Sequence, residues 1–148
     1  MPFKYRLEKV LKIREEELDE AILEMKKAED HLRAVSYELS ATTEKRNDLH
    51  LELINEGLSH ATLYVRRIKQ LNEKIAQLEK DLQAAQDALI KAKEEVVEAK
   101  TRLEALKRHK GKKLKDYTEE ENRKEGIRLD EIGVLKHSRE LIESSTEE

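Results

Sequence analysis

The sequence predicts an all-α protein, a long antiparallel two-helix coiled-coil hairpin with an overhanging C-terminal helix. Charged residues make up 43% of the 148 residues and aromatic residues only 3%, a composition typical of long helices with a narrow apolar seam. Apolar residues recur at alternating steps of three and four along two long stretches. A glycine lies between these stretches, at position 57. Together these features favour one elongated coiled-coil domain over residues 1–148.

The first helix is expected over residues 3–55, because Pro2 is tolerated in the first turn of a helix. Twelve of the fifteen positions in its heptad frame are apolar, the exceptions being Arg14, Thr42 and Arg46. A repeat of 3.5 residues kept over this length predicts a left-handed supercoil. The frame consists of Phe3, Leu7, Leu11, Arg14, Leu18, Ala21, Met25, Ala28, Leu32, Val35, Leu39, Thr42, Arg46, Leu49 and Leu53.

A turn is expected at residues 56–59. Gly57 suits the left-handed backbone conformation in which helices commonly end. The alternative is a flexible break within one continuous helix. The local residues favour a tight reversal of the chain.

The second helix is expected over residues 60–142, and all fourteen positions of its frame are apolar. In an antiparallel hairpin, facing residues have numbers that sum to about 114, which pairs Leu32 with Leu82 and Ala28 with Ala85. This layer-by-layer match favours an intramolecular hairpin over a pair of separate chains. The frame consists of Ala61, Tyr64, Ile68, Leu71, Ile75, Leu78, Leu82, Ala85, Leu89, Ala92, Val96, Ala99, Leu103 and Leu106.

The pairing should end where Phe3 faces Gly111, so the second helix is expected to continue unpaired after about residue 111. Apolar residues in this extension fall into two competing frames, and residues 143–148 are expected to form a frayed tail. A helix with apolar residues and no intramolecular partner indicates an interaction surface. The two frames are Tyr117, Ile127, Val134 and Leu141, or Leu129, Ile132, Leu135 and Ile142.

The motifs of common catalytic sites are absent from the sequence. It contains no phosphate loop, GxSxG, HExxH or calcium-loop pattern, and no cysteine. The five histidines never pair at i,i+3 or i,i+4, so most are expected to be solvated residues on helix faces. We therefore expect a non-enzymatic protein without a metal site or cofactor. No long apolar stretch occurs, and a cytoplasmic protein is expected.

Residues 107–115 form the strongest charge feature, a run of six Lys and Arg residues with no acid. Residues 116–148, in contrast, contain eleven acids and five bases. Such a run can bind nucleic acid or an anionic membrane, but no aromatic residues interleave with it for base stacking. A solvated face, or a patch that steers an acidic protein, is the favoured interpretation. The basic residues are Lys107, Arg108, Lys110, Lys112, Lys113 and Lys115.

Both ends of the chain carry a family resemblance. Residues 3–17 read FKYRLEKVLKIREEE, which resembles the opening of the FliJ/YscO family: aromatic-x-aromatic-x-Leu-x-x-Val-Leu-x-x-Arg followed by acids. Residues 128–132 read RLDEI and resemble the Leu-Asp-Glu-Ile stretch of that family. Gly133 stands where a small residue such as alanine is expected.

The resemblance implies a cytoplasmic, stalk-like component at the base of a type III protein export apparatus, flagellar or injectisome. Such a component is expected to bind and stimulate the hexameric export ATPase and to contact the export gate protein and export chaperones. A generic structural spacer, or less favourably a nucleic-acid or membrane binder acting through the basic run, is the alternative. The resemblance implies partner-binding residues at Phe3, Tyr5, Leu7, Val10, Leu11, Arg14, Leu129, Asp130, Glu131 and Ile132.

Overall fold

The computed structural model describes residues 2–146, apart from the side chain of Leu58. Helix α1 spans Glu8–Glu56, a 3-10 turn spans Gly57–His60, and helix α2 spans Ala61–Thr146. No strand occurs among residues 2–146, and the predicted all-α two-helix hairpin is confirmed. The contacts divide the chain into two units: the hairpin unit (Arg14–Arg102) and the end unit (Met1–Ile13 with Leu103–Glu148). Each unit is described by itself.

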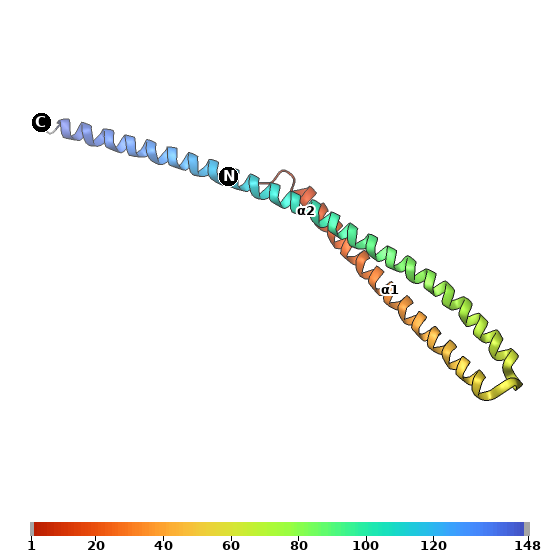
Figure 1. Cartoon of the computed structure of the whole chain (residues 1–148). Coiled ribbons are helices and arrows are strands. Elements are labelled where there is room, and N and C mark those ends of the chain that lie inside the picture. Colours follow the sequence, from red (N-terminus) through yellow and green to blue (C-terminus); the bar gives the residue numbers. More distant parts are fainter. Residues whose placement is uncertain (1, 147–148) are drawn as a thin grey trace. The chain divides into compact units, whose positions relative to one another are not determined.

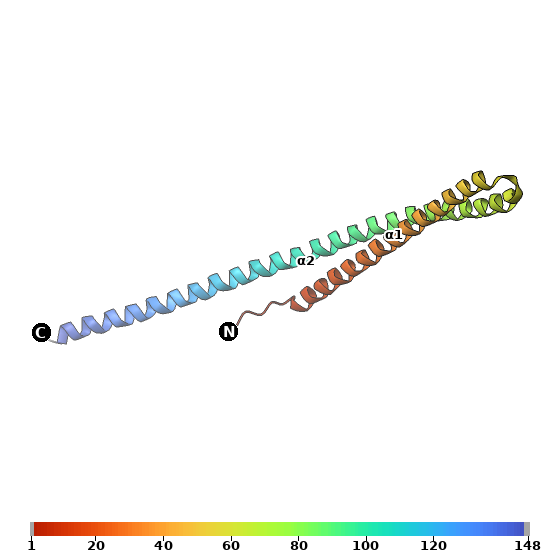
Figure 2. The same ribbon diagram turned by 90° about the horizontal axis from the view of Figure 1, so that it is seen from below.

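The hairpin unit consists of two antiparallel helices packed along one seam. Both views show its part of α1 running beside its part of α2 on either side of the turn (Figures 1 and 2). Every residue assigned to the seam within this unit is buried or half-buried, which confirms the heptad frame. Burial of apolar surface stabilises the unit by roughly 25 cal/mol per Å².

Small residues recur in the seam of α2 at intervals of seven. Ala85, Ala92 and Ala99 are only 2%, 8% and 6% exposed. A methyl side chain that is almost fully covered means that the facing helix approaches closely at these layers. Larger side chains there would overpack the layer, at a cost of about 1–3 kcal/mol.

Polar contacts between the two helices agree with the expected register. The Lys74 ammonium lies 3.4 Å from the Glu38 carboxylate, and the Arg46 guanidinium donates a hydrogen bond of 3.1 Å to Asn72 Oδ1. The residue numbers of these pairs sum to 112 and 118, close to the expected 114. Because the ion pair is exposed, it contributes at most ~1 kcal/mol, and the apolar seam determines the register.

The reversal of the chain depends on Gly57. Its φ of 73° lies in the left-handed region, which side chains with a Cβ atom disfavour. The Tyr64 hydroxyl donates a 2.9 Å hydrogen bond to the Glu56 carboxylate and so joins the two sides of the turn. This hydrogen bond, followed by burial and the charges of Glu56 and Glu52, raises the pKa of Tyr64.

In the end unit, α1 begins at Glu8 rather than at residue 3. The Glu8 N–H donates to the Tyr5 carbonyl at 3.2 Å, and the first α-helical hydrogen bond runs from the Leu11 N–H to the Leu7 carbonyl at 2.9 Å. Residues 2–5 are not helical, yet Phe3 and Leu7 are half-buried. The apolar spacing therefore predicts that Phe3 and Leu7 are covered, but it does not predict the backbone conformation of this segment.

The part of α2 in the end unit has two kinds of surface. Leu103 is 5% exposed, like Leu11 of α1, and both are buried within this unit. From Ile127 to Ile142, in contrast, every large apolar residue is between 44% and 65% exposed, including the members of both competing frames in this range. Since no residue of the unit that the structure describes covers this stretch, its apolar residues are available to a partner.

The C-terminal end of α2 reaches further than the sequence predicts. The helix continues to Thr146, so residues 143–146 are helical rather than frayed, while residues 147–148 lie outside the described part of the chain. The Ser144 and Ser145 hydroxyls donate to the Leu141 and Ile142 carbonyls at 3.1 and 2.9 Å. No helix within residues 2–146 is long and apolar enough to cross a membrane.

Candidate partner-binding site

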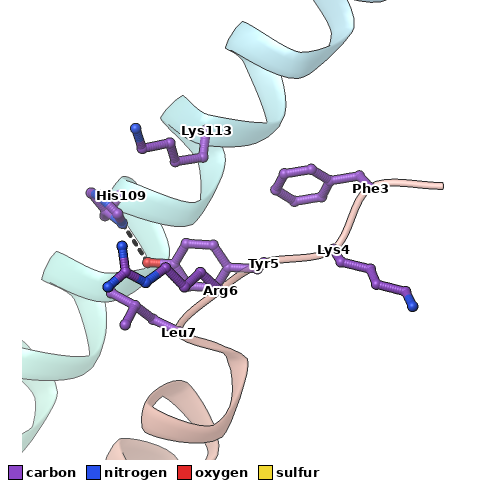
Figure 3. A pocket seen from close by; sticks show the side chains of 7 residues that line it. All are labelled: Phe3, Lys4, Tyr5, Arg6, Leu7, His109 and Lys113. Atoms are coloured by element: carbon purple, nitrogen blue, oxygen red, sulfur yellow. Dashed lines mark hydrogen bonds between the residues drawn. The ribbon is translucent and has the colours of Figure 1, made fainter. Parts of the chain in front are cut away.

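The N-terminal segment lies against α2 of the end unit through two aromatic contacts. The ring centroids of Phe3 and Tyr117 are 5.4 Å apart, and those of Tyr5 and His109 are 5.6 Å apart. The Tyr5 hydroxyl is also hydrogen-bonded to His109 Nδ1 (Figure 3). Aromatic pairs at these distances contribute about 0.5–1.5 kcal/mol each beyond their buried area. Four side chains thus hold a non-helical segment in a defined position.

Phe3 contacts Tyr117 rather than the expected Gly111, and the extended conformation accounts for part of this displacement along α2. An extended segment advances about 3.3 Å per residue, against 1.5 Å for a helix. Two residues beyond Tyr5 therefore carry the chain further along α2 than two helical residues would. The sequence-based pairing holds for Tyr5 and His109, whose numbers sum to 114, and fails for Phe3.

An ion pair fixes the first turn of α1 beside the same segment. The Lys110 ammonium lies 2.8 Å from the Glu8 carboxylate and 6.0 Å from the centroid of the Tyr5 ring. Glu8 is acidic and lies at the N-terminus of α1, where the helix dipole favours a negative charge. The cation over the ring adds a contact of about 0.5–1 kcal/mol. The start of α1 is therefore tied to the middle of the basic run.

These contacts border a cavity of about 600 Å³ that is open to solvent, which we call the N-terminal cleft. It is lined by residues 3–7, His109 and Lys113 (Figure 3). Its walls combine two aromatic rings and a leucine with three cationic side chains, and no acidic residue among residues 2–146 lines it. This volume lies within the range of about 300–1,000 Å³ that is typical of ligand pockets.

The partner-binding residues predicted at the start of the chain occupy three environments. Phe3, Tyr5 and Leu7 line the N-terminal cleft, whereas Leu11 is buried and Val10 is half-buried. Leu11 is thus a packing residue of the end unit. Arg14 belongs to the hairpin unit, where its guanidinium donates two hydrogen bonds to the Glu17 carboxylate at 2.9 and 3.2 Å.

The predicted residues near the C-terminus all lie on the exposed part of α2. Leu129 and Ile132 are 59% and 54% exposed. Asp130 and Glu131 flank a shallow groove with Ile127, Val134 and Leu135. The apolar residues of this groove come from both competing frames, because an uncovered helix has no single buried face. Their role in binding a partner stays a prediction.

The residues of the basic run also occupy different environments. Lys110 is paired with Glu8 and Lys113 lines the N-terminal cleft. The remaining members are exposed on α2: Lys107, Arg108, Lys112 and Lys115. The N-terminal aromatics and this run are separate features of the sequence, but the structure brings both to one cleft.

Sequence reasoning also missed three residues of the cleft: Lys4, Arg6 and His109. The sequence predicts that most histidines are solvated, and His109 is exposed but also contacts Tyr5. Lys4 and Arg6 alternate with Phe3 and Tyr5, so a period of two in residues 3–6 was the available signal for an extended segment. Among residues 2–146, no group of three or more acidic or histidine side chains is arranged to hold a metal ion.

Comparisons with known proteins support the resemblance seen in the sequence. The family model described as flagellar FliJ protein matches residues 3–141. A solved structure described as a YscO homolog from Chlamydia trachomatis superposes with a TM-score of 0.74 at 22% sequence identity, covering 93% of this chain and 96% of that one. No curated protein matches the sequence.

Proposed function

The chain belongs to the flagellar FliJ family, and on that premise we propose that it is a stalk-like component that binds the hexameric export ATPase and stimulates its turnover. Family membership makes the chain a component of type III protein export. The proposal adds its partners: the ATPase, the export gate protein and export chaperones. It also places the chain in the cytoplasm, at the base of the export apparatus.

One observation carries the proposal: the family-like stretch at residues 128–132 lies on an uncovered helix. Leu129 and Ile132 each expose more than half of their surface, and Val134 and Leu135 continue the same apolar stretch at 65% and 63% exposure. Exposed apolar surface of this extent is unfavourable in water, at roughly 25 cal/mol per Å². A partner that covers this stretch would recover that free energy, which supports a binding role for it.

The proposed action on the ATPase occurs by contact. The sequence has no phosphate-binding motif, so the stimulated hydrolysis is assigned to the partner's own active site. A family member of this kind acts as a non-enzymatic structural protein. Because one stalk would serve one hexamer, stimulation should saturate near one chain per six ATPase subunits.

Complex formation with the cognate export ATPase tests the binding step. The variant Leu129→Ser/Ile132→Ser should weaken binding about tenfold, since losing two half-exposed apolar contacts costs on the order of 1–2 kcal/mol. The matched control is Ile90→Ser/Val97→Ser, which alters two residues of α2 that are 57% and 63% exposed in the hairpin unit. Affinity can be measured by analytical ultracentrifugation with the full chain.

Equal loss of affinity in both double variants would show that residues 129 and 132 have no special role. Unchanged affinity in the first variant would remove the C-terminal part of α2 from the proposed interface. Circular dichroism of each variant provides the folding control, because all four positions are exposed and their replacement should preserve the helices.

A further inference from the structure

The N-terminal cleft lies in the most positively charged part of the chain. Residues 1–13 and 107–115 together contain ten Lys and Arg residues and one acid, a net charge of +9 in a chain whose net charge is −3. That one acid, Glu8, forms an ion pair with Lys110 at 2.8 Å. From this charge and from the lining of the cleft, we propose that the N-terminal cleft binds an acidic polypeptide segment of a partner protein.

The cations that line the cleft are free to bind such a segment. Lys4, Arg6 and Lys113 form no ion pair with any acid among residues 2–146, the part of the chain that the structure describes. Figure 3 shows the Arg6 and Lys113 side chains extending toward the side of the helix that carries His109, whereas Lys4 extends away from it. Two cationic groups on one wall can bind successive carboxylates of a peptide, and an arginine can bind one of them with two parallel hydrogen bonds.

The apolar part of the lining suits the side chains between such carboxylates. Phe3, Tyr5 and Leu7 are half-buried and line the same cavity as the cations. An acidic segment that carries an apolar residue would pair its carboxylates with the cationic wall and cover these three side chains. Charge alone would steer the segment to the cleft, and the apolar contact would hold it there.

The aromatic rings favour a polypeptide over a nucleic acid. Binding of single-stranded nucleic acid depends on free ring faces on which the bases stack. The Phe3 ring already packs on Tyr117, and the Tyr5 ring packs on His109 with the Lys110 ammonium above it. These rings are therefore walls of the cleft rather than platforms for bases.

This inference rests on the proposed function, because it names the chemistry of a partner segment at the predicted N-terminal binding residues. Its test contains no ATPase. Failure of the peptide to bind would leave ATPase stimulation through residues 129–132 unaffected. Failure of stimulation, in turn, would leave the peptide-binding cleft in place.

The test is a fluorescence anisotropy titration of the full chain with a short labelled peptide that is rich in Glu and Asp and contains one Leu. A second peptide carries Gln and Asn in place of the acids. The acidic peptide should bind, the neutral peptide should not, and added salt should weaken the binding. The variant Arg6→Gln/Lys113→Gln should reduce affinity about tenfold, since it removes two exposed charge pairs.

The matched control is Lys136→Gln/Arg139→Gln, which removes the same net charge from an exposed part of α2 outside the cleft. This control should bind the acidic peptide like the wild type. Equal weakening in both variants would reduce the effect to net charge and overturn the proposal. So would a preference for a single-stranded oligonucleotide or for phosphatidylserine vesicles over the acidic peptide in direct competition.

Discussion

The hairpin is most sharply tested by a charge placed in its seam, at Ile75. This residue is 6% exposed, so its replacement by Asp loses nearly the whole contribution of a buried isoleucine, about 1.5–3 kcal/mol. A carboxylate without a partner adds a further penalty of a few kcal/mol. We expect Ile75→Asp to destabilise the protein by roughly 4–6 kcal/mol in total. At ~3 °C per kcal/mol for a chain of this size, Tm should fall by more than about 10 °C.

The assay is thermal unfolding followed by circular dichroism, with Ile90→Asp as the control. Ile90 lies on the same helix but is 57% exposed, so its replacement should change stability by less than about 1 kcal/mol. Comparable Tm values for the two variants would refute the assignment of Ile75 to a buried seam between the helices.

The pH dependence of Ile75→Asp offers a second check. A buried carboxyl has a folded-state pKa above its unfolded value of about 3.9, so the folded state binds the extra proton. The deficit of Ile75→Asp relative to the wild type should therefore shrink as pH falls from 7 toward about 4. A stability deficit that grows over this range would show that the ionised carboxylate is stabilised in the folded state rather than buried without a partner.

Two further predictions concern backbone and pKa. Gly57→Ala should lower the free energy of unfolding by about 1–2 kcal/mol, because φ is 73° there. Gly133→Ala should raise it by up to about 1 kcal/mol, because alanine is the better helix former within α2. Neither new Cβ meets an atom within 4 Å, so changes of the same sign in thermal unfolding would contradict the backbone argument. An NMR titration should find the pKa of Tyr64 above its ordinary 10.0, and Glu56→Gln should lower it, because the hydrogen bond from the hydroxyl to the carboxylate favours the neutral phenol. This hydrogen bond is retained below the raised pKa and lost as pH rises through it; an unchanged pKa in the variant would exclude it as the cause.

The seam and the turn could be predicted from the sequence because each has a direct physical signature. A stripe with a period of 3.5 residues is the condition for two helices to stay in contact, and every predicted seam position is buried or half-buried. Gly57 could be assigned to the turn because only glycine adopts positive φ without strain. These features depend on residues close in sequence or on one repeating rule.

The N-terminal cleft could not be predicted, because it depends on contacts that no repeat encodes. Phe3 and Leu7 continue the heptad spacing, so the pattern extended the first helix over residues that are not helical in the structure. The contacts of Tyr5 with His109 and of Phe3 with Tyr117 join residues more than one hundred positions apart. Lys4 and Arg6 thereby join the basic run, which the sequence presented as an isolated patch.

The stretch at 127–142 was ambiguous for a different physical reason. A single frame can be assigned only when a partner covers one face of the helix. Both sets of apolar residues in this stretch are exposed, so intramolecular packing selects neither. A binding partner would make that selection.

Turnover of the cognate export ATPase, titrated with the full chain, tests the central claim most directly. The wild type should raise hydrolysis and saturate near one chain per six ATPase subunits. Leu129→Ser/Ile132→Ser should raise the concentration needed for half-maximal stimulation about tenfold, while circular dichroism stays unchanged. A double variant near the turn, Ile54→Ser/Leu63→Ser, replaces residues that are 75% and 69% exposed and should stimulate like the wild type. Hydrolysis that does not respond to the wild-type chain would contradict the stalk role. Stimulation lost only in the turn variant would assign the ATPase contact to the turn at Gly57–His60.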